Sequence, residues 1–267
     1  MEKVEPAMKP SGRKRCGRTH RRLTGAICAV LLALALVAAL APFTLAVAPS
    51  FPDVPDTHPH HDAISYLALH QIIDGYVTGE FGPDGEVTRQ QFAKMIVLAG
   101  GYQVSEADEC PFADVLKGGP ETLYPDNYVA VCAAKGITTG KTQTTFDPYG
   151  NITRHQVISM VVRAADDLQP GLLATPPDDW RATGIWGNDV THGANAARAE
   201  YNSLLQELDL DTLDPTMSMT RGEVARVLYN LMVLLWPETT TTQPAATTVT
   251  DPPPPTESTT TTAGCGG

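Results

Sequence analysis

The sequence predicts an all-α fold built from three tandem helix–loop–helix units, followed by a disordered tail. Three observations support this prediction. A twelve-residue pattern that contains a Thr-Arg pair occurs three times without a gap. Apolar residues with helical spacing follow each Thr-Arg pair. After Trp236 the composition changes to Thr and Pro, which cannot build a hydrophobic core. The folding part of the chain is therefore a short repeat array.

The N-terminal 48 residues have the three-part layout of an export signal. A basic stretch from Arg13 to Arg22 precedes an apolar run from about Gly25 to Leu40, and small residues follow at Ala46-Val47-Ala48. The stretch from Gly25 to Ala48 is also about long enough to span a bilayer, so an uncleaved membrane anchor is the alternative. Either interpretation places the chain from Pro49 onward outside the cell.

The charge of the chain is divided unevenly. Eight of the 19 Lys and Arg residues and two of the 30 Asp and Glu residues lie in the first 48 positions, so the remainder carries 11 basic and 28 acidic side chains, a net charge of −17. Such a field repels nucleic acid and anionic lipid. We therefore expect no nucleic-acid partner, and binding of an anionic polymer requires a few locally placed cations.

Three units are predicted, at residues 49–107, 108–174 and 175–236. The twelve-residue pattern in them runs over 81–92, 146–157 and 213–224. Upstream, Phe51-Pro-Asp53-Val54 of the first unit matches Phe112-Ala-Asp114-Val115 of the second. Gly75 and Gly140 stand thirteen residues before the threonine of their unit and mark the turn that ends the first helix.

The second helix of each unit has one apolar face. Its members are Phe92, Met95, Ile96 and Ala99, then Val157, Met160, Val161 and Ala164, then Val224, Val227, Leu228 and Leu231. We interpret all three faces, methionines included, as core and not as a soft-metal or promiscuous binding surface.

Helix capping explains most of the Thr-Arg pattern. A threonine at the N-cap accepts a hydrogen bond from the backbone, and Gln or Glu three residues later can reach back to the cap residue, which makes a capping box. The predicted pairs are Thr88 with Gln91, Thr153 with Gln156, and Thr220 with Glu223. Each cap stabilises by about 1 kcal/mol.

The arginine of each pair is not explained by helix stability. A cation in the first turn faces the positive end of the helix dipole, which costs roughly 0.3–1 kcal/mol. A guanidinium beside free helix N-terminal N–H groups suits the binding of a carboxylate or similar anion. The arginines are Arg89, Arg154 and Arg221. The alternative is that each pairs with an acid of the chain, such as Asp53, Asp114 or Asp189.

The Phe-x-Asp-Val opening, the turn glycine, the Phe-x-Pro element and the Thr-Arg-x-Gln/Glu helix start resemble S-layer homology repeats over about residues 51–235. The resemblance implies three repeats in a pseudo-threefold arrangement, with the first helices at the centre. It also implies grooves between neighbours that bind secondary cell-wall polysaccharide, often through pyruvylated sugars. The ligand-binding residues that it implies are Arg89, Arg154, Arg221, Asp53, Asp114, Gly75 and Gly140.

The sequence departs from the family pattern in two ways. Gln91 and Gln156 replace the usual acid, which keeps the capping box but removes a charge. The third unit has Glu207 at the position of the turn glycine, and its opening at 186–190 carries one extra residue. We therefore predict a degenerate third repeat and two working sites, with Arg89 and Arg154 ahead of Arg221.

Cysteines of an exported chain tend to form disulfides. Cys110 and Cys132 enclose a short loop in the second unit, and a disulfide between them would stabilise by roughly 3 kcal/mol. Cys265, in the tail, either cross-links to a partner or stays free. Cys16 and Cys28 belong to the export segment.

Other polar groups do not indicate catalysis or metal binding. The spacing of His58, His60 and His61 fits no standard metal site and is typical of a solvated loop. We find no Ser/His/Asp, Cys/His or paired-carboxylate set whose spacing supports a reaction. We therefore predict a protein that is not an enzyme and needs no metal or cofactor.

These features predict an exported, non-catalytic protein of the bacterial cell wall or cell surface. It would bind a wall polysaccharide and present residues 237–267 as a Thr/Pro stalk toward a surface partner whose identity the sequence does not give. Two alternatives remain open: a module that binds another surface protein, and the anchor part of a wall-associated hydrolase.

Overall fold

The structure is a computed structural model that describes residues 49–119 and 121–237, which belong to one compact unit. The predicted export segment, nearly all of the predicted stalk, and Cys265 lie outside the described residues. Within them the chain forms six α-helices, and its only strand pairing is three isolated bridges. The all-α prediction is therefore confirmed. No helix in the described part is long and apolar enough to cross a membrane.

Short and long helices alternate along the chain. The short helices are α2 (His61–Leu69), α4 (Asp126–Ala134) and α6 (Gly193–Tyr201), and the others are α3 (Arg89–Ala99), α5 (Arg154–Leu168) and α7 (Arg221–Leu235). Each predicted unit therefore contributes one short helix and the longer helix that follows it.

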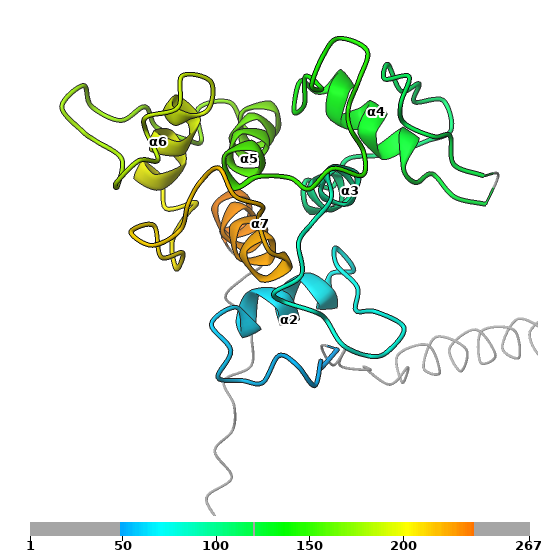
Figure 1. The fold of residues 1–267 in the computed structure, drawn as a ribbon, viewed down its shortest axis with the longest axis horizontal. Coiled ribbons are helices and arrows are strands. Elements are labelled where there is room, and N and C mark those ends of the chain that lie inside the picture. Colours follow the sequence, from blue (N-terminus) through cyan, green and yellow to red (C-terminus); the bar gives the residue numbers. More distant parts are fainter. Residues whose placement is uncertain (1–48, 120, 238–267) are drawn as a thin grey trace, which may run out of the picture. The chain divides into compact units, whose positions relative to one another are not determined.

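The longer helices α3, α5 and α7 contact one another at the centre, and the short helices lie outside them (Figure 1). Helix α4 packs on α3, α6 on α5, and α2 on α7. Each long helix is thus covered by the short helix of the next unit, and the first unit covers the last. The expectation that the first helices lie at the centre is wrong. The longer second helices bury more residues and take that place.

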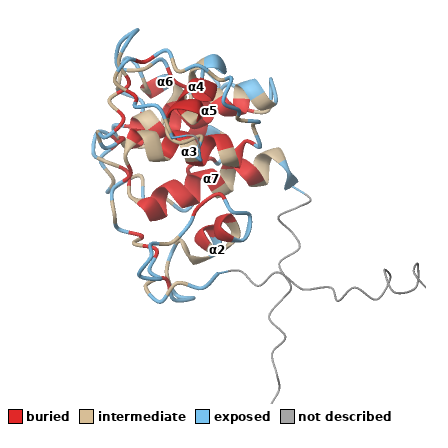
Figure 2. Cartoon of the chain, turned by 90° about the vertical axis from the view of Figure 1, so that its right-hand side faces the viewer, coloured by how far each residue is buried: buried red, intermediate tan, exposed pale blue. Residues whose placement is uncertain are grey.

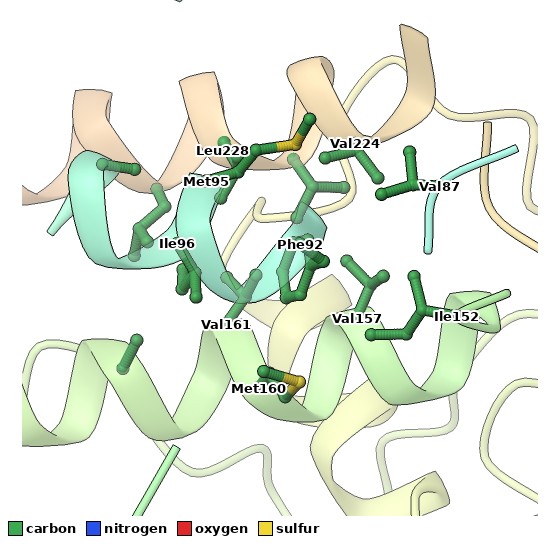
Figure 3. Close-up of a cluster of buried hydrophobic side chains, with 14 of the residues drawn as sticks. Val87, Phe92, Met95, Ile96, Ile152, Val157, Met160, Val161, Val224 and Leu228 are labelled. Atoms are coloured by element: carbon green, nitrogen blue, oxygen red, sulfur yellow. The ribbon is translucent and has the colours of Figure 1, made fainter. Parts of the chain in front are cut away.

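The core lies between the three central helices. Figure 3 shows Phe92 and Ile96 of α3 facing Val157 and Val161 of α5, and Met95 of α3 beside Leu228 of α7. Met95 and Met160 are both buried, which confirms that they belong to the core. Buried residues concentrate on the helices, whereas the loops that join them are mostly exposed (Figure 2).

All three predicted capping boxes form. Each threonine has an extended backbone, and its side chain accepts from the N–H of the third helical residue, whose own side chain accepts from the threonine N–H. Three helices therefore begin with nearly the same geometry.

The residues that precede the threonines close a ring around the pseudo-threefold axis. The N–H of Val87 donates to the carbonyl of Met219, that of Met219 to Ile152, and that of Ile152 to Val87. All three side chains are fully buried. The ring satisfies six backbone groups in the core and fixes the three helix starts relative to one another.

Candidate ligand-binding grooves

The N-terminus of each long helix is closed by the turn of the next unit. The N–H of Arg89 donates to the carbonyl of Gly150 (2.9 Å), and that of Gln90 to Pro148 (3.1 Å). The same two bonds run from α5 to Met217 and Pro215, and from α7 to Gly85 and Pro83. The expectation that these N–H groups are free to bind an anion is therefore wrong, because the chain itself uses them.

The arginine side chains donate hydrogen bonds to the same turns that the helix N–H groups contact. The Nε of Arg89 donates to the carbonyl of Phe146 (2.6 Å), and its Nη1 to Oε1 of Gln156 (3.1 Å). Its guanidinium lies 4.7 Å from the centre of the Phe146 ring, a cation–π contact. Arg89 thus joins the first unit to the second through neutral partners.

Arg221 makes the corresponding contacts from the third unit to the first. Its Nε donates to the carbonyl of Phe81 and its Nη2 to that of Asp74, both at 2.9 Å. The rings of Tyr76 and Phe81 lie 4.8 and 4.5 Å from the guanidinium. Aromatic rings therefore cover this arginine.

Arg154 differs because it has a carboxylate partner. Its Nε and Nη2 donate to the two carboxylate oxygens of Glu223 (3.0 and 2.8 Å), and Nη1 donates to the carbonyl of Asp214. Both charged side chains are only 9% exposed. This buried bidentate ion pair joins the second unit to the third.

The predicted aspartates orient the turns and do not pair directly with the arginines. Asp53 accepts from the N–H groups of Phe81 and Gly82. Asp114 accepts from those of Phe146 and Asp147. Desolvation acts to raise the pKa of both carboxyls, but these hydrogen bonds outweigh it and lower the pKa below its ordinary value.

Asp189 also accepts backbone hydrogen bonds, from Thr191 and His192. The acid that does pair with a motif arginine is Glu223, which the sequence had assigned only to a capping box. Its side chain both completes the capping box of Thr220 and pairs with Arg154.

The turn glycines are required by close contacts. A Cβ at Gly140, whose φ is +73°, would lie 2.4 Å from the Phe112 ring and 2.6 Å from two carbonyl oxygens. A Cβ at Gly75 would lie 2.6 Å from the Phe51 ring. The aligned residue in the third unit, Glu207, keeps a φ of +66° with a side chain in place.

The structure groups the predicted residues across units. Asp114 and Gly140 of the second unit lie with Arg89 of the first. Asp53 and Gly75 of the first unit lie with Arg221 of the third. Glu207, in the unit without a turn glycine, therefore belongs to the region of Arg154 and not to that of Arg221. The ranking of Arg154 ahead of Arg221 assumed a grouping by unit, which the structure does not have.

An open groove of about 430 Å³ lies beside Arg89. We call it the open groove, and it is lined by Arg89, Thr138, Thr139, Gly140, Lys141, Gln156, Ser159, Met160, Arg163, Thr191 and His192. Three of these residues are Arg or Lys, and none is Asp or Glu. Lys141 also pairs with Asp147, which is outside the lining set. Part of a strongly acidic chain therefore presents a locally cationic concave surface.

The corresponding region between the third and first units is narrower, and the cavity beside Glu207, Arg226 and Asn230 holds about 200 Å³. Arg226 is the sixth residue of α7, as Ser159 is of α5. Its Nη2 lies 2.9 Å from both the Glu207 carboxylate and the Pro59 carbonyl. His60 precedes α2 as His192 precedes α6. We call this region, made by Arg154, Glu207, Glu223, Arg226 and His60, the plugged groove.

Sequence reasoning missed Lys141, Ser159, Arg163 and His192 of the open groove. None of them belongs to the Thr-Arg pattern, and they come from three segments of the chain. The available signal was their difference from the aligned residues: Ser159, for example, stands where the other long helices have Lys94 and Arg226.

The predicted disulfide is not formed in the structure. Cys110 and Cys132 are both free thiols, and each lies near a different carbonyl, Cys110 near Phe112 and Cys132 near Ala93. Cys132 is completely buried in α4, where burial raises the pKa of its thiol above the ordinary value. In this structure both cysteines pack as thiols.

Comparison with known proteins identifies the family. The model of the S-layer homology domain matches residues 50–93 and 114–158. The chain contains S-layer homology domains. The two matches cover most of the first unit and the first helix, turn and second-helix start of the second. The region 175–236 lies outside them.

Relatives include bacterial surface proteins. The chain is 28% identical over 209 residues to an S-layer protein of Bacillus licheniformis, which covers 76% of this chain and 22% of that protein. It is 32% identical over 183 residues to an endoglucanase of Bacillus sp. strain KSM-635, which covers 68% and 18%. A cellulosome-anchoring protein of Acetivibrio thermocellus is 26% identical over 121 residues, which covers 44% and 26%.

These relatives are much longer than the matched region, so the chain spans about a fifth to a quarter of each. The family and the relatives together indicate a protein of the bacterial cell surface or cell wall, with a role in anchoring.

Proposed function

We propose that this protein attaches to the bacterial cell wall by binding an anionic wall polysaccharide in the open groove, and that it is not an enzyme. The observation that carries the proposal is the set of three cations, Arg89, Lys141 and Arg163, without a carboxylate among the lining residues. In a chain whose exported part has a net charge of −17, such a surface is selective for an anion.

The shape of the groove fits a sugar. It is concave, it holds about 430 Å³, and it combines charged groups with the hydroxyls of Thr138, Thr139 and Thr191. Sugars and carboxylates both accept hydrogen bonds from such groups. A pyruvylated sugar, which carries a carboxylate on a ketal, matches this chemistry. Gly140 keeps the turn beside Arg89 in place, and Asp114 orients the turn that Arg89 contacts.

The proposal assigns different roles to the three motif arginines. Arg89 lines the open groove, whereas Arg154 is held by Glu223. Arg221, with Gly75 and Asp53, forms a second candidate site. A ligand would reach its guanidinium only after the Tyr76 ring had moved away from it. A relative that is named as a cellulosome-anchoring protein agrees with an anchoring role, and we extend it to this chain.

The test is sedimentation of the full chain with purified cell-wall sacculi. Lys141→Ala with Arg163→Ala should weaken binding by about tenfold or more, because two charged contacts are lost. Both side chains are at least partly exposed, so the fold should persist. Lys117→Ala with Arg181→Ala removes the same charge from exposed positions outside the groove and should bind like the parent.

Two outcomes would overturn the proposal. One is the absence of sedimentation with sacculi, and the other is equal loss of binding in both double variants. Capture of a surface protein after the polysaccharide has been stripped would favour the interaction module, and release of soluble sugar from sacculi would favour the hydrolase alternative. Mild acid treatment that removes ketal-linked pyruvate tests the pyruvylated sugar separately.

A further inference from the structure

The open groove contains a histidine that neither the Thr-Arg pattern nor helix capping requires. His192 directly precedes α6, makes no side-chain cap hydrogen bond there, and lines the groove with Arg163 and Lys141. Its Nδ1 lies 2.8 Å from the hydroxyl oxygen of Ser159, which is 1% exposed. The ring is therefore held at the groove wall by a buried residue of α5.

Because its partner is a hydroxyl, the ring of His192 can keep this hydrogen bond in either charge state. A serine hydroxyl donates to the nitrogen of a neutral imidazole and accepts from an imidazolium, so His192 can keep its position when it gains a proton. Among the described residues, no hydrogen bond uses Nε2 of His192. That nitrogen is the one available to a ligand in the groove.

The surroundings of His192 favour the neutral form of its ring. Burial lowers the pKa of its ring, His155 and Arg163 on α5 lower it further, and Asp189 in the preceding loop opposes them. His155 stacks on the ring at 5.8 Å between centroids. Arg89 and Lys141 line the same groove. Asp189 is the one acid among these groups, and among the described residues it makes no ion pair with the ring, so a bound anion would supply a direct anionic partner.

We propose that His192 is a proton-dependent contact for an anionic group of the wall polysaccharide, so that attachment through the open groove strengthens as the pH falls. This inference rests on the proposed function of the groove. A bound carboxylate stabilises the imidazolium and raises the pKa of His192 in the complex. By linkage, affinity rises as the pH falls from the pKa of the complex to that of the free protein, and it is constant outside this window. Each unit of difference between the two pKa values strengthens binding tenfold.

The plugged groove provides a matched control. His60 occupies the same position before α2, but there Arg226 replaces the serine and its charge occupies the region. His60→Gln should therefore leave the pH dependence of polysaccharide binding unchanged, whereas His192→Gln should remove it. Both variants lose one histidine that precedes a short helix.

The experiment measures sedimentation of the full chain with sacculi between pH 8 and pH 5, at fixed ionic strength. We expect the parent to bind about threefold to tenfold more tightly at pH 5 than at pH 8, relative to His192→Gln. The proton resonances of the His192 ring should titrate at a higher pH when soluble polysaccharide released from sacculi is added.

The outcomes distinguish this inference from the proposed function. If the parent sediments with sacculi but His192→Gln keeps the same pH dependence, or if the titration of the ring does not move, the inference is wrong and the groove assignment stands. If the parent does not sediment at any pH, the groove assignment itself fails. A melting curve of each variant at both pH values identifies a variant that has merely unfolded.

Discussion

The open groove and the plugged groove share the same backbone contacts but differ in the side chains that line them. In both, a long helix begins with a Thr-Arg pair whose N–H groups and guanidinium bind the turn of the next unit. The open groove has Gly140 at the turn and Ser159 on the helix, and the plugged groove has Glu207 and Arg226 at these positions. The two small residues leave a cavity, whereas the two large charged ones pair across it.

This difference shows that the Thr-Arg pattern maintains the fold in every unit, whether or not a groove is available. Capping boxes and the ring of Val87, Ile152 and Met219 are complete on all three sides. Whether a groove is open depends on residues outside the pattern, Gly140 and Ser159 on one side and Glu207 and Arg226 on the other. A repeat with an intact pattern can therefore stabilise the domain without offering a ligand site.

The largest expected effect concerns stability on the plugged side. Glu223→Gln should lower the free energy of unfolding by about 3 kcal/mol, because it leaves the buried guanidinium of Arg154 without its carboxylate. The capping box should survive, since Gln already serves at the corresponding positions 91 and 156. Urea unfolding of the full chain measures the change.

A double variant provides the control for that prediction. Arg154→Met in the Glu223→Gln background removes the unpaired charge and should recover a large part of the stability. A loss below about 1 kcal/mol in the single variant would mean that Arg154 is as replaceable as a surface cation, and that the two grooves differ less than their contacts indicate.

Closing the open groove should have the next largest effect. Ser159→Arg copies the plugged side, and the added side chain would fill space that the ligand needs. We expect sedimentation with sacculi to weaken by about tenfold, although a positive charge is added. Lys94 is the aligned residue on α3, outside the groove lining, so Lys94→Arg serves as the control. Tighter binding of Ser159→Arg would show that charge, and not free volume, distinguishes the grooves.

The reverse change should open the plugged groove. Arg226→Ser with Glu207→Gly removes the ion pair and restores a glycine where φ is +66°, which relieves a left-handed strain of about 1 kcal/mol. We expect the amount of soluble polysaccharide bound per protein at saturation to rise by about one equivalent, on the one-site-per-groove assumption. Unchanged stoichiometry in a folded protein would mean that Arg154, held by Glu223, cannot serve a ligand.

Local features of the structure could be predicted from the sequence, because they depend on residues close together in the chain. The capping boxes follow from threonine and Gln or Glu three positions apart, and the buried Met95 and Met160 follow from helical spacing. Contacts between units could not be predicted in the same way. The N–H groups of α3 bind a turn some sixty residues later, and those of α7 bind a turn in the first unit.

The central position of the long helices and the assignment of Glu207 to the Arg154 region also depend on this cyclic packing. The sequence-based ranking of Arg89 and Arg154 ahead of Arg221 rested on the missing turn glycine of the third unit, and so took a glycine and an arginine of the same unit together. In the structure Arg89 lies with Gly140, and Arg221 contacts the turn of Gly75. A repeat pattern alone does not specify which neighbour completes a site.

The smallest expected effect is acid sensitivity on the plugged side. Burial lowers the pKa of His60 to about 4, from an ordinary value of 6.5, and the charges of Arg226 and His58 add to this. The folded state therefore favours the neutral ring. Its contribution to stability is complete above pH 6.5 and is lost as the pH falls toward 4. The difference in melting temperature between pH 7 and pH 4.5 should be a few degrees smaller in His60→Gln than in the parent.

His70→Gln, at an exposed position after α2, should keep the parental difference. An equal difference in all three proteins would show that the ring of His60 is not confined beside Arg226, and that the plugged groove is more accessible to water than its contacts indicate.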